Sequence, residues 1–297
     1  MIYSIENEKL WVQVNDYGAE LWSVYHKTDK IEHLWQGEAS IWPRRAPICF
    51  PICGALTGGS CTVAGDTYQM PMHGFARDFV HTLIENTATS LHFRLSATQE
   101  TRAMYPFDFQ LDSIFTLAGD TLRHAFTISN GGAQTMPYSI GYHTGYRCFH
   151  GATESLADLE LQFDAAEPTL LALDAARVAA GEASVLSDGG KTMQLVDGLF
   201  TDTIILKEKV SSSITLYNRA TKRGVNIGTA GFGSLLLWSC LGETPYLCIE
   251  PWHGEKEANG DYGDLANKPS MRLLAAGETF TCAQTITPIC PSCINLQ

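Results

Sequence analysis

The sequence predicts an all-β protein, built as a large antiparallel β-sandwich. First, apolar and polar residues alternate with period two through most of the 297 residues, as in strands with one buried face. Second, two hairpin signals, Ala64-Gly65-Asp66 and Ala118-Gly119-Asp120, are each flanked by alternating segments. Third, the alternating runs are short and are separated by Gly, Asp and Asn, which favours tight turns between strands.

The expected strands follow this alternation in chain order. Strands are expected at residues 10–14, 21–25, 61–63, 67–70, 90–96, 113–117, 121–126, 159–163, 203–206, 213–217, 225–227, 235–239, 246–249 and 280–286. The alanine-rich segment 169–184 is the one helix-like stretch, and we expect it as an excursion between strands. No linker, repeat or low-complexity segment interrupts the pattern, so residues 1–297 are expected to form a single domain.

Composition and charge narrow the class of protein. The 45% hydrophobic and 18% charged residues are typical of a globular chain. A net charge of -12 argues against nucleic acid and anionic membrane as partners, because both attract basic surfaces. The first residues lack a basic region followed by an apolar run, and no apolar stretch is long enough to span a membrane, so we expect a cytoplasmic protein. Both a monomer and a homodimer are compatible with the sequence.

The nine cysteines do not form a recognisable metal or disulfide framework. Cys290 and Cys293 form a Cys-x-x-Cys near the end of the chain, and Cys49 and Cys53 flank an apolar tripeptide. We expect reduced thiols that pack as small hydrophobic side chains. The alternative is that Cys290 and Cys293 form a disulfide or bind a metal ion. No glycine-rich phosphate loop, Gly-x-Ser-x-Gly or His-Glu-x-x-His occurs, so we expect neither a cofactor nor a metal.

The segment Met72-His73-Gly74-Phe75-Ala76-Arg77-Asp78 is a candidate binding loop, because it lacks the alternation of a strand. Its small residues, Gly74 and Ala76, allow a ligand to approach the backbone. Arg77 offers a forked donor suited to an oxyanion or to vicinal hydroxyls. The alternative is an ordinary loop in which Arg77 pairs with Asp78 and His73 is solvated.

Two further segments place a titratable side chain on predicted β structure. His143 lies between glycines and tyrosines, a setting that suits a sugar cleft, although it could instead be a strand histidine bound to a carbonyl. Glu250 ends an apolar run, and burial beside Trp252 would raise its pKa and make it a general base. The alternative for Glu250 is a buried ion pair with a strand arginine. Trp238 lies in an apolar run where a core position is favoured over a sugar platform.

Together these segments resemble the aldose 1-epimerase (galactose mutarotase) superfamily, and above all its bacterial galactose mutarotase-like branch. The order and spacing of the motifs carry the resemblance over essentially the whole chain. The matching segments are residues 17–21, 33–37, 42–51, 73–78, 105–107, 139–143 and 249–252. The resemblance implies a β-supersandwich with a cleft on one open face, and cofactor-free interconversion of the α and β anomers of an aldohexose.

The resemblance also implies roles for individual residues. Glu250 would be the general base that takes the C1 hydroxyl proton. His143 would be the general acid that protonates the ring oxygen, so that the ring opens and recloses. His73 would hold sugar hydroxyls, and Asp202 matches an acidic position that contacts the sugar. The other expected substrate-binding residues are Arg77, Arg45 and Trp252.

Two departures from the branch keep other functions open. The branch usually has Gly-Gly-His-Pro-Ala-Phe where this chain has Gly141-Tyr142-His143-Thr144-Gly145-Tyr146. Relatives often carry an arginine where Ala55 stands, and Arg44 or Arg45 could replace it. One rival is a sugar-binding or regulatory module with little turnover. The other is a hexose-6-phosphate mutarotase, in which Arg77 with Arg44 or Arg45 binds the phosphate.

Overall fold

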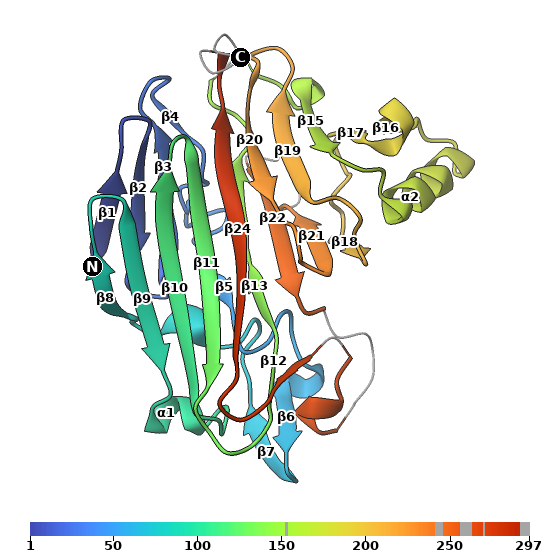
Figure 1. Ribbon diagram of the computed structural model, residues 1–297. Helices are drawn as coiled ribbons and strands as arrows, with labels where there is room; N and C mark the ends of the chain where they lie inside the picture. Colours follow the sequence, from blue (N-terminus) through green and yellow to red (C-terminus); the bar gives the residue numbers. More distant parts are fainter. Residues whose placement is uncertain (152–153, 241–245, 256–262, 270, 292–297) are drawn as a thin grey trace.

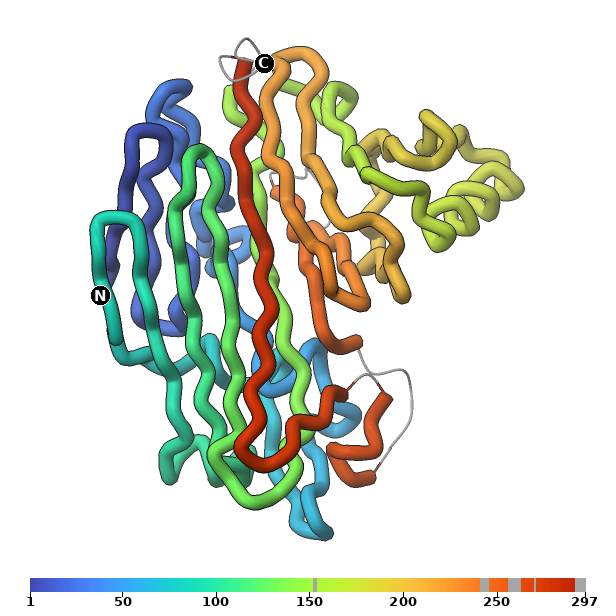
Figure 2. The backbone as a smooth tube through the Cα atoms, in the orientation of Figure 1, coloured from blue at the N-terminus to red at the C-terminus, as the bar shows by residue number. Residues whose placement is uncertain are grey.

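The computed structural model describes residues 1–151, 154–240, 246–255, 263–269 and 271–291, and β-sheets dominate it (Figure 1). The largest sheet has ten strands in the order β16-β17-β15-β19-β20-β24-β11-β10-β9-β8. Its strands are β8 (Thr82–Asn86), β9 (Ser90–Ser96), β10 (Phe109–Ala118), β11 (Thr121–Asn130), β15 (Leu159–Phe163), β16 (Leu186–Ser187), β17 (Thr192–Gln194), β19 (Ser213–Asn218), β20 (Arg223–Gly228) and β24 (Thr279–Ile289). The long β24 lies between β20 and β11, so the end of the chain completes the middle of this sheet (Figure 2).

Two smaller sheets lie behind the ten-stranded sheet in Figure 1. The six-stranded sheet has the order β18-β21-β22-β13-β5, with β14 also paired to β22. Its strands are β5 (Ile48–Cys49), β13 (Ile140–Tyr142), β14 (Thr144–Arg147), β18 (Ile204–Lys207), β21 (Ser234–Trp238) and β22 (Tyr246–His253). The four-stranded sheet consists of β1 (Ile2–Glu6), β2 (Leu10–Asn15), β3 (Glu20–His26) and β4 (Ile31–Glu32). Two-stranded sheets are formed by β6 (Ser60–Val63) with β7 (Asp66–Gln69), and by β12 (Met136–Tyr138) with β23 (Arg272–Leu274).

Side chains from the facing sheets interlock to form the core. Phe126 of β11 stacks on Tyr142 of β13 with ring centroids 4.4 Å apart, and the Tyr142 hydroxyl donates to the backbone carbonyl of His124. Tyr3 of β1 packs edge-on against Phe93 of β9. Both smaller sheets therefore pack against the same large sheet, which confirms the predicted antiparallel sandwich.

Both predicted hairpins are present, because the turn residues and the alternating segments on either side of them favour the same strand pairing. β6 and β7 pair from Ser60↔Gln69 to Val63↔Asp66. β10 and β11 pair over their full lengths, ending at Ala118↔Thr121. In both hairpins the alanine and glycine named above precede an aspartate, and the glycines have positive φ, which glycine adopts without steric cost.

Helices are few and peripheral. α1 (Gln99–Arg102) is a single turn, and α2 (Pro168–Ala179) projects beside β16 at one end of the large sheet (Figure 1). The predicted helix at 169–184 is confirmed but ends earlier, because Gly181 follows with φ of +88°. Short 3₁₀ segments lie at Thr57–Gly59, Ala76–Asp78, Leu156–Asp158, Asp188–Gly190 and Leu265–Asn267. No helix within the described residues has the length and apolar character to cross a membrane.

The cysteines mostly behave as expected. Cys49, Cys53, Cys148 and Cys248 are buried free thiols. Cys290 is disulfide-bonded, so for this residue the expectation of a reduced thiol is wrong. Cys293 lies outside the described residues.

Candidate active site

A cavity of about 300 Å³ opens over the six-stranded sheet. Five of the seven expected site residues line it: His73, Arg77, His143, Glu250 and Trp252. They come from three segments that lie far apart in the sequence. The fold thus brings together the three motifs that the sequence singled out.

Strand pairing explains why His143 and Glu250 meet. β22 pairs with β13 up to Gly141 and with β14 from Thr144. His143, which separates these two short strands, therefore lies beside Glu250 on β22. A sheet holds both side chains on rigid backbone, which favours a fixed geometry.

Trp252 lines the cavity, and a glycine makes room for its indole ring. A Cβ atom at Gly141 would lie 2.2 Å from Cδ1 of the Trp252 indole, so no larger residue fits there. The indole Nε1 donates to the backbone carbonyl of Tyr142 at 3.0 Å. This hydrogen bond fixes the plane of the ring next to Glu250.

His143 and Glu250 form a buried acid–base pair. Their Nε2 and Oε2 atoms lie 3.5 Å apart, and the side chains are only 11% and 2% exposed. Burial raises the pKa of Glu250 well above its usual value, and the Cys49 sulfur adds to the increase. Burial lowers the pKa of His143 well below its usual value, and the neighbouring His73 lowers it further. Both shifts favour one proton on Glu250 beside a neutral His143.

This neutral pair has a charge-separated counterpart with the same number of protons. Transfer of one proton from Glu250 to His143 gives a carboxylate beside an imidazolium. In either form, one member can accept a proton and the other can donate one. The pair can therefore carry out general acid–base chemistry on a ligand in the cavity.

His73 is held in a fixed orientation by its own loop. Its Nδ1 accepts a hydrogen bond from the Gly54 backbone N–H at 3.1 Å, so the neutral ring carries its proton on Nε2. The Cys49 sulfur lies 3.3 Å from the same nitrogen. Both His73 and Gly74 have positive φ, of +65° and +70°. A Cβ atom on Gly74 would lie 2.1 Å from the Phe50 carbonyl oxygen, so only glycine fits at this position. The ring centroid is 5.1 Å from that of His143.

Arg77 reaches the cavity from the 3₁₀ segment Ala76–Asp78. Its Nη2 donates to the Met72 carbonyl at 2.7 Å, which ties the two ends of the loop together. Burial lowers the pKa of Arg77, but a guanidinium keeps its charge at neutral pH. The adjacent Asp78 carboxylate pairs with Arg44, which is not among the side chains that line the cavity.

Two expected site residues lie elsewhere. The Arg45 guanidinium stacks on Trp22 at 3.9 Å and donates to the Trp22 carbonyl and to Gln36 Oε1. Asp202 is exposed, and its carboxylate accepts from the backbone N–H of Thr203. Neither side chain lines the cavity, whereas Thr203 does.

Sequence reasoning missed an aromatic wall. Trp42 lines the cavity with its ring centroid 5.3 Å from that of His143. Trp238, for which the sequence favours a core position, also lines the cavity, with its ring centroid 5.7 Å from that of His143. Tyr246 stacks behind Trp42 at 5.2 Å. Trp42 lies in one of the motifs that resemble the family, but only the fold places it beside His143.

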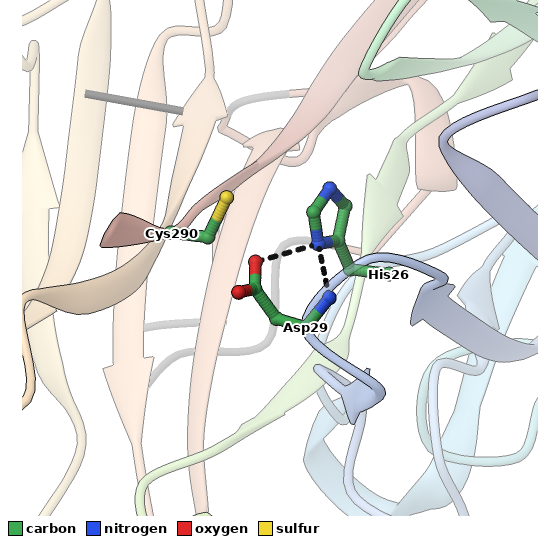
Figure 3. A group of neighbouring side chains, drawn as sticks. All are labelled: His26, Asp29 and Cys290. Atoms are coloured by element: carbon green, nitrogen blue, oxygen red, sulfur yellow. Dashed lines mark hydrogen bonds and ion pairs between the residues drawn. The ribbon is translucent and has the colours of Figure 1, made fainter. Parts of the chain in front are cut away.

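Two groups of side chains within the described ranges have the composition of a metal site. In the first, His26, Asp29 and Cys290 offer ligand atoms within 4.8 Å of one another (Figure 3). The His26 Nδ1 already contacts the Asp29 carboxylate at 2.9 Å, and the Cys290 sulfur is disulfide-bonded rather than a thiolate. The second group is His143, Cys248 and Glu250, in which Cys248 is a free thiol.

The fold and the cavity define a β-sandwich protein with an acid–base pair over one sheet, and comparison with known proteins gives its family. A model of the aldose 1-epimerase family matches residues 1–260. The chain therefore belongs to the aldose 1-epimerase family.

Individual relatives cover almost the whole chain. Protein LacX from Lactococcus lactis subsp. lactis is 29% identical, over 97% of this chain and 99% of its own length. The solved structure of a galactose mutarotase related enzyme from Lactobacillus acidophilus is also 29% identical, with a TM-score of 0.86 over 97% of both chains. A galactose mutarotase-like protein from Lactobacillus casei is 24% identical, with a TM-score of 0.84 over 97% of this chain and 100% of that one. The fold is thus the galactose mutarotase-like β-supersandwich.

Proposed function

We propose that this protein interconverts the α and β anomers of a free aldohexose, using Glu250 and His143 to transfer protons. The observation that carries the proposal is the 3.5 Å separation of these two side chains inside the cavity. Anomer exchange requires one proton to leave the C1 hydroxyl and another to reach the ring oxygen. One carboxyl group and one imidazole in contact provide both functions.

The proposed reaction uses the charge-separated form of the pair. Glu250 takes the proton of the C1 hydroxyl while His143 gives its proton to the ring oxygen. The C1–O5 bond breaks and leaves an open-chain aldehyde. Rotation about C1–C2 presents the other face of the carbonyl, and the reverse proton transfers close the ring as the second anomer. The proton count of the protein is unchanged at the end of each cycle.

The remaining cavity residues bind and orient the sugar in this proposal. His73 donates from Nε2 to a hydroxyl, since its Nδ1 already accepts from Gly54. Trp42 and Trp238 pack against the C–H face of the ring, as aromatic side chains commonly do in sugar sites. Arg77 reaches the hydroxyls furthest from C1.

The distribution of arginines supports a free sugar over a sugar phosphate. The phosphate hypothesis needs Arg77 to converge with Arg44 or Arg45. Arg77 lines the cavity, but Arg44 pairs with Asp78, and Arg45 stacks on Trp22. A single guanidinium in a protein of net charge -12 is a weak site for a dianion.

Two of the departures around His143, at Tyr142 and Thr144, do not count against turnover. Tyr142 points into the core, where it stacks on Phe126. Thr144 is buried, and its hydroxyl accepts from Gln284. Neither side chain is part of the described cavity lining, so neither would contact a sugar bound beside His143.

Polarimetry tests the proposal. Freshly dissolved α-galactose, α-glucose and glucose 6-phosphate would each be followed to equilibrium at several protein concentrations, with the spontaneous rate subtracted. Galactose is the first choice because one similar solved structure is that of a galactose mutarotase related enzyme. We expect acceleration that is proportional to protein for at least one free hexose. If calorimetry showed that a hexose binds while its mutarotation is not accelerated, the sugar-binding module would be supported instead. If only the mutarotation of glucose 6-phosphate were accelerated, the hexose-6-phosphate mutarotase would be supported.

A further inference from the structure

We propose that His143, Cys248 and Glu250 form a binding site for a thiophilic divalent metal ion such as Zn²⁺, and that the bound ion blocks the acid–base pair. The ion would act as an inhibitor and not as a cofactor. The metal binding stands on the geometry alone, whereas the inhibition rests on the proposed function.

The three side chains are close to the arrangement that zinc requires. Their ligand atoms all lie within 4.8 Å of one another. Tetrahedral zinc, with bonds of about 2.0–2.3 Å, holds its ligand atoms roughly 3.3–3.8 Å apart. The His143 Nε2 and Glu250 Oε2 are already 3.5 Å apart. The Cys248 sulfur would therefore need to approach by at most about 1.5 Å.

The sheet positions all three ligands independently of any ion. Cys248 and Glu250 are two residues apart on β22, so their side chains point to the same face of the sheet. His143 comes from the adjacent connection between β13 and β14. The ligand types are also suitable, because imidazole, thiolate and carboxylate are the three side chains that bind zinc in proteins.

The charges and the open side of the group suit a divalent cation. A thiolate and a carboxylate together offset its two positive charges, and the imidazole binds as a neutral ligand. Binding releases the Cys248 thiol proton, and any proton on Glu250, to solvent. His143 and Glu250 line the cavity, so a fourth position would face it and could hold water.

The bound ion would occupy the atoms that the reaction needs. With the Glu250 oxygen and the His143 Nε2 both on the metal, neither can exchange a proton with a sugar. Turnover would then fall in proportion to the fraction of protein with metal bound. A sugar in the cavity would weaken metal binding by the same factor as the metal weakens sugar binding.

Cobalt titration tests the site without relying on turnover. Protein treated with chelator and dialysed, free of oxygen and of thiol reductants, would be titrated with Co²⁺, whose bond to a thiolate gives a charge-transfer absorption band. We expect one equivalent with this band for wild type and for Cys282→Ala, a control at a free cysteine that belongs to neither metal group. Cys248→Ala should lose the band and bind Co²⁺ more than ~100-fold more weakly. Removing even a group that only hydrogen-bonds to a metal ligand lowers metal affinity about 10–100-fold.

Three results would overturn the proposal. They are absence of the band in wild type, an unchanged band in Cys248→Ala, and loss of the band in His26→Ala, which would place the ion at the other group. Mutarotation assays with added Zn²⁺ then test the inhibition, with Cys248→Ala expected to keep its basal rate and to resist zinc. Cobalt binding without any mutarotation would refute the proposed function and leave the site standing. Mutarotation without cobalt binding would refute the metal site and leave the proposed function standing.

Discussion

Replacing the two cavity histidines separately should produce opposite kinetic signatures. His143→Asn removes the imidazole whose Nε2 lies 3.5 Å from the Glu250 Oε2. Asparagine can hydrogen-bond but cannot deliver a proton to the ring oxygen. Loss of a general acid costs about 10²–10⁴ in rate, which is about 2.7–5.5 kcal/mol on the barrier. We therefore expect kcat to fall by that factor with a small change in KM.

His73→Asn should behave differently, because the His73 ring faces the sugar only through Nε2. Its Nδ1 is engaged with the Gly54 N–H. Removing one neutral hydrogen bond to a hydroxyl costs about 0.5–1.5 kcal/mol, which raises KM roughly 2- to 13-fold and leaves kcat nearly unchanged.

Polarimetry over a range of galactose concentrations separates kcat from KM for both variants. The unfolding midpoint of each variant controls for damage to the fold, since both histidines lie in packed surroundings. A large loss of kcat in His73→Asn, with only a KM effect in His143→Asn, would refute the assignment of the acid.

Three other predictions concern stability, specificity and metals. Burial lowers the pKa of His81 to about 4. As the pH falls below 6.5, the unfolded chain therefore takes up a proton on His81 before the folded chain does. This difference should lower the free energy of unfolding by up to about 3 kcal/mol between pH 6.5 and pH 4. Urea titrations should show a shallower pH dependence for His81→Gln; parallel curves would contradict this. Arg77→Ala should weaken galactose binding modestly, and calorimetry showing selective, Arg77-dependent binding of glucose 6-phosphate would overturn the free-hexose assignment. Mutarotation should survive exhaustive chelation, and a loss that one added metal restores would show that a metal is required.

Local sequence signals were sufficient for much of the fold. The hairpins β6–β7 and β10–β11 were predictable because a glycine turn and the alternation on both sides lie within about 20 residues. The short strands β13 and β14 were predicted only as β structure around His143, without bounds, because their partners lie far away in the sequence. Both strands pair with β22, about 100 residues away, and β13 also pairs with β5. Such strands depend on tertiary pairing and leave only a weak pattern of their own.

The site was predictable to the extent that its motifs are local. His73, His143 and Glu250 could be named from their neighbours, but sequence gives no direction for a side chain. Arg45 was expected in the cleft, yet its backbone N–H donates to the buried Glu20 carboxylate and its guanidinium turns towards Trp22. Long-range contacts of this kind also decide that Trp42 faces the cavity.

Glu250→Gln tests the central claim most directly. The amide keeps the size of the side chain but cannot accept the C1 hydroxyl proton. Polarimetry and calorimetry on the same preparation would compare the variant with wild type on galactose, with the unfolding midpoint as a control. We predict a rate lower by about 10²–10⁴, with galactose affinity changed only a few-fold. A folded Glu250→Gln protein that equilibrates the anomers at the wild-type rate would remove Glu250 from the reaction and contradict the account.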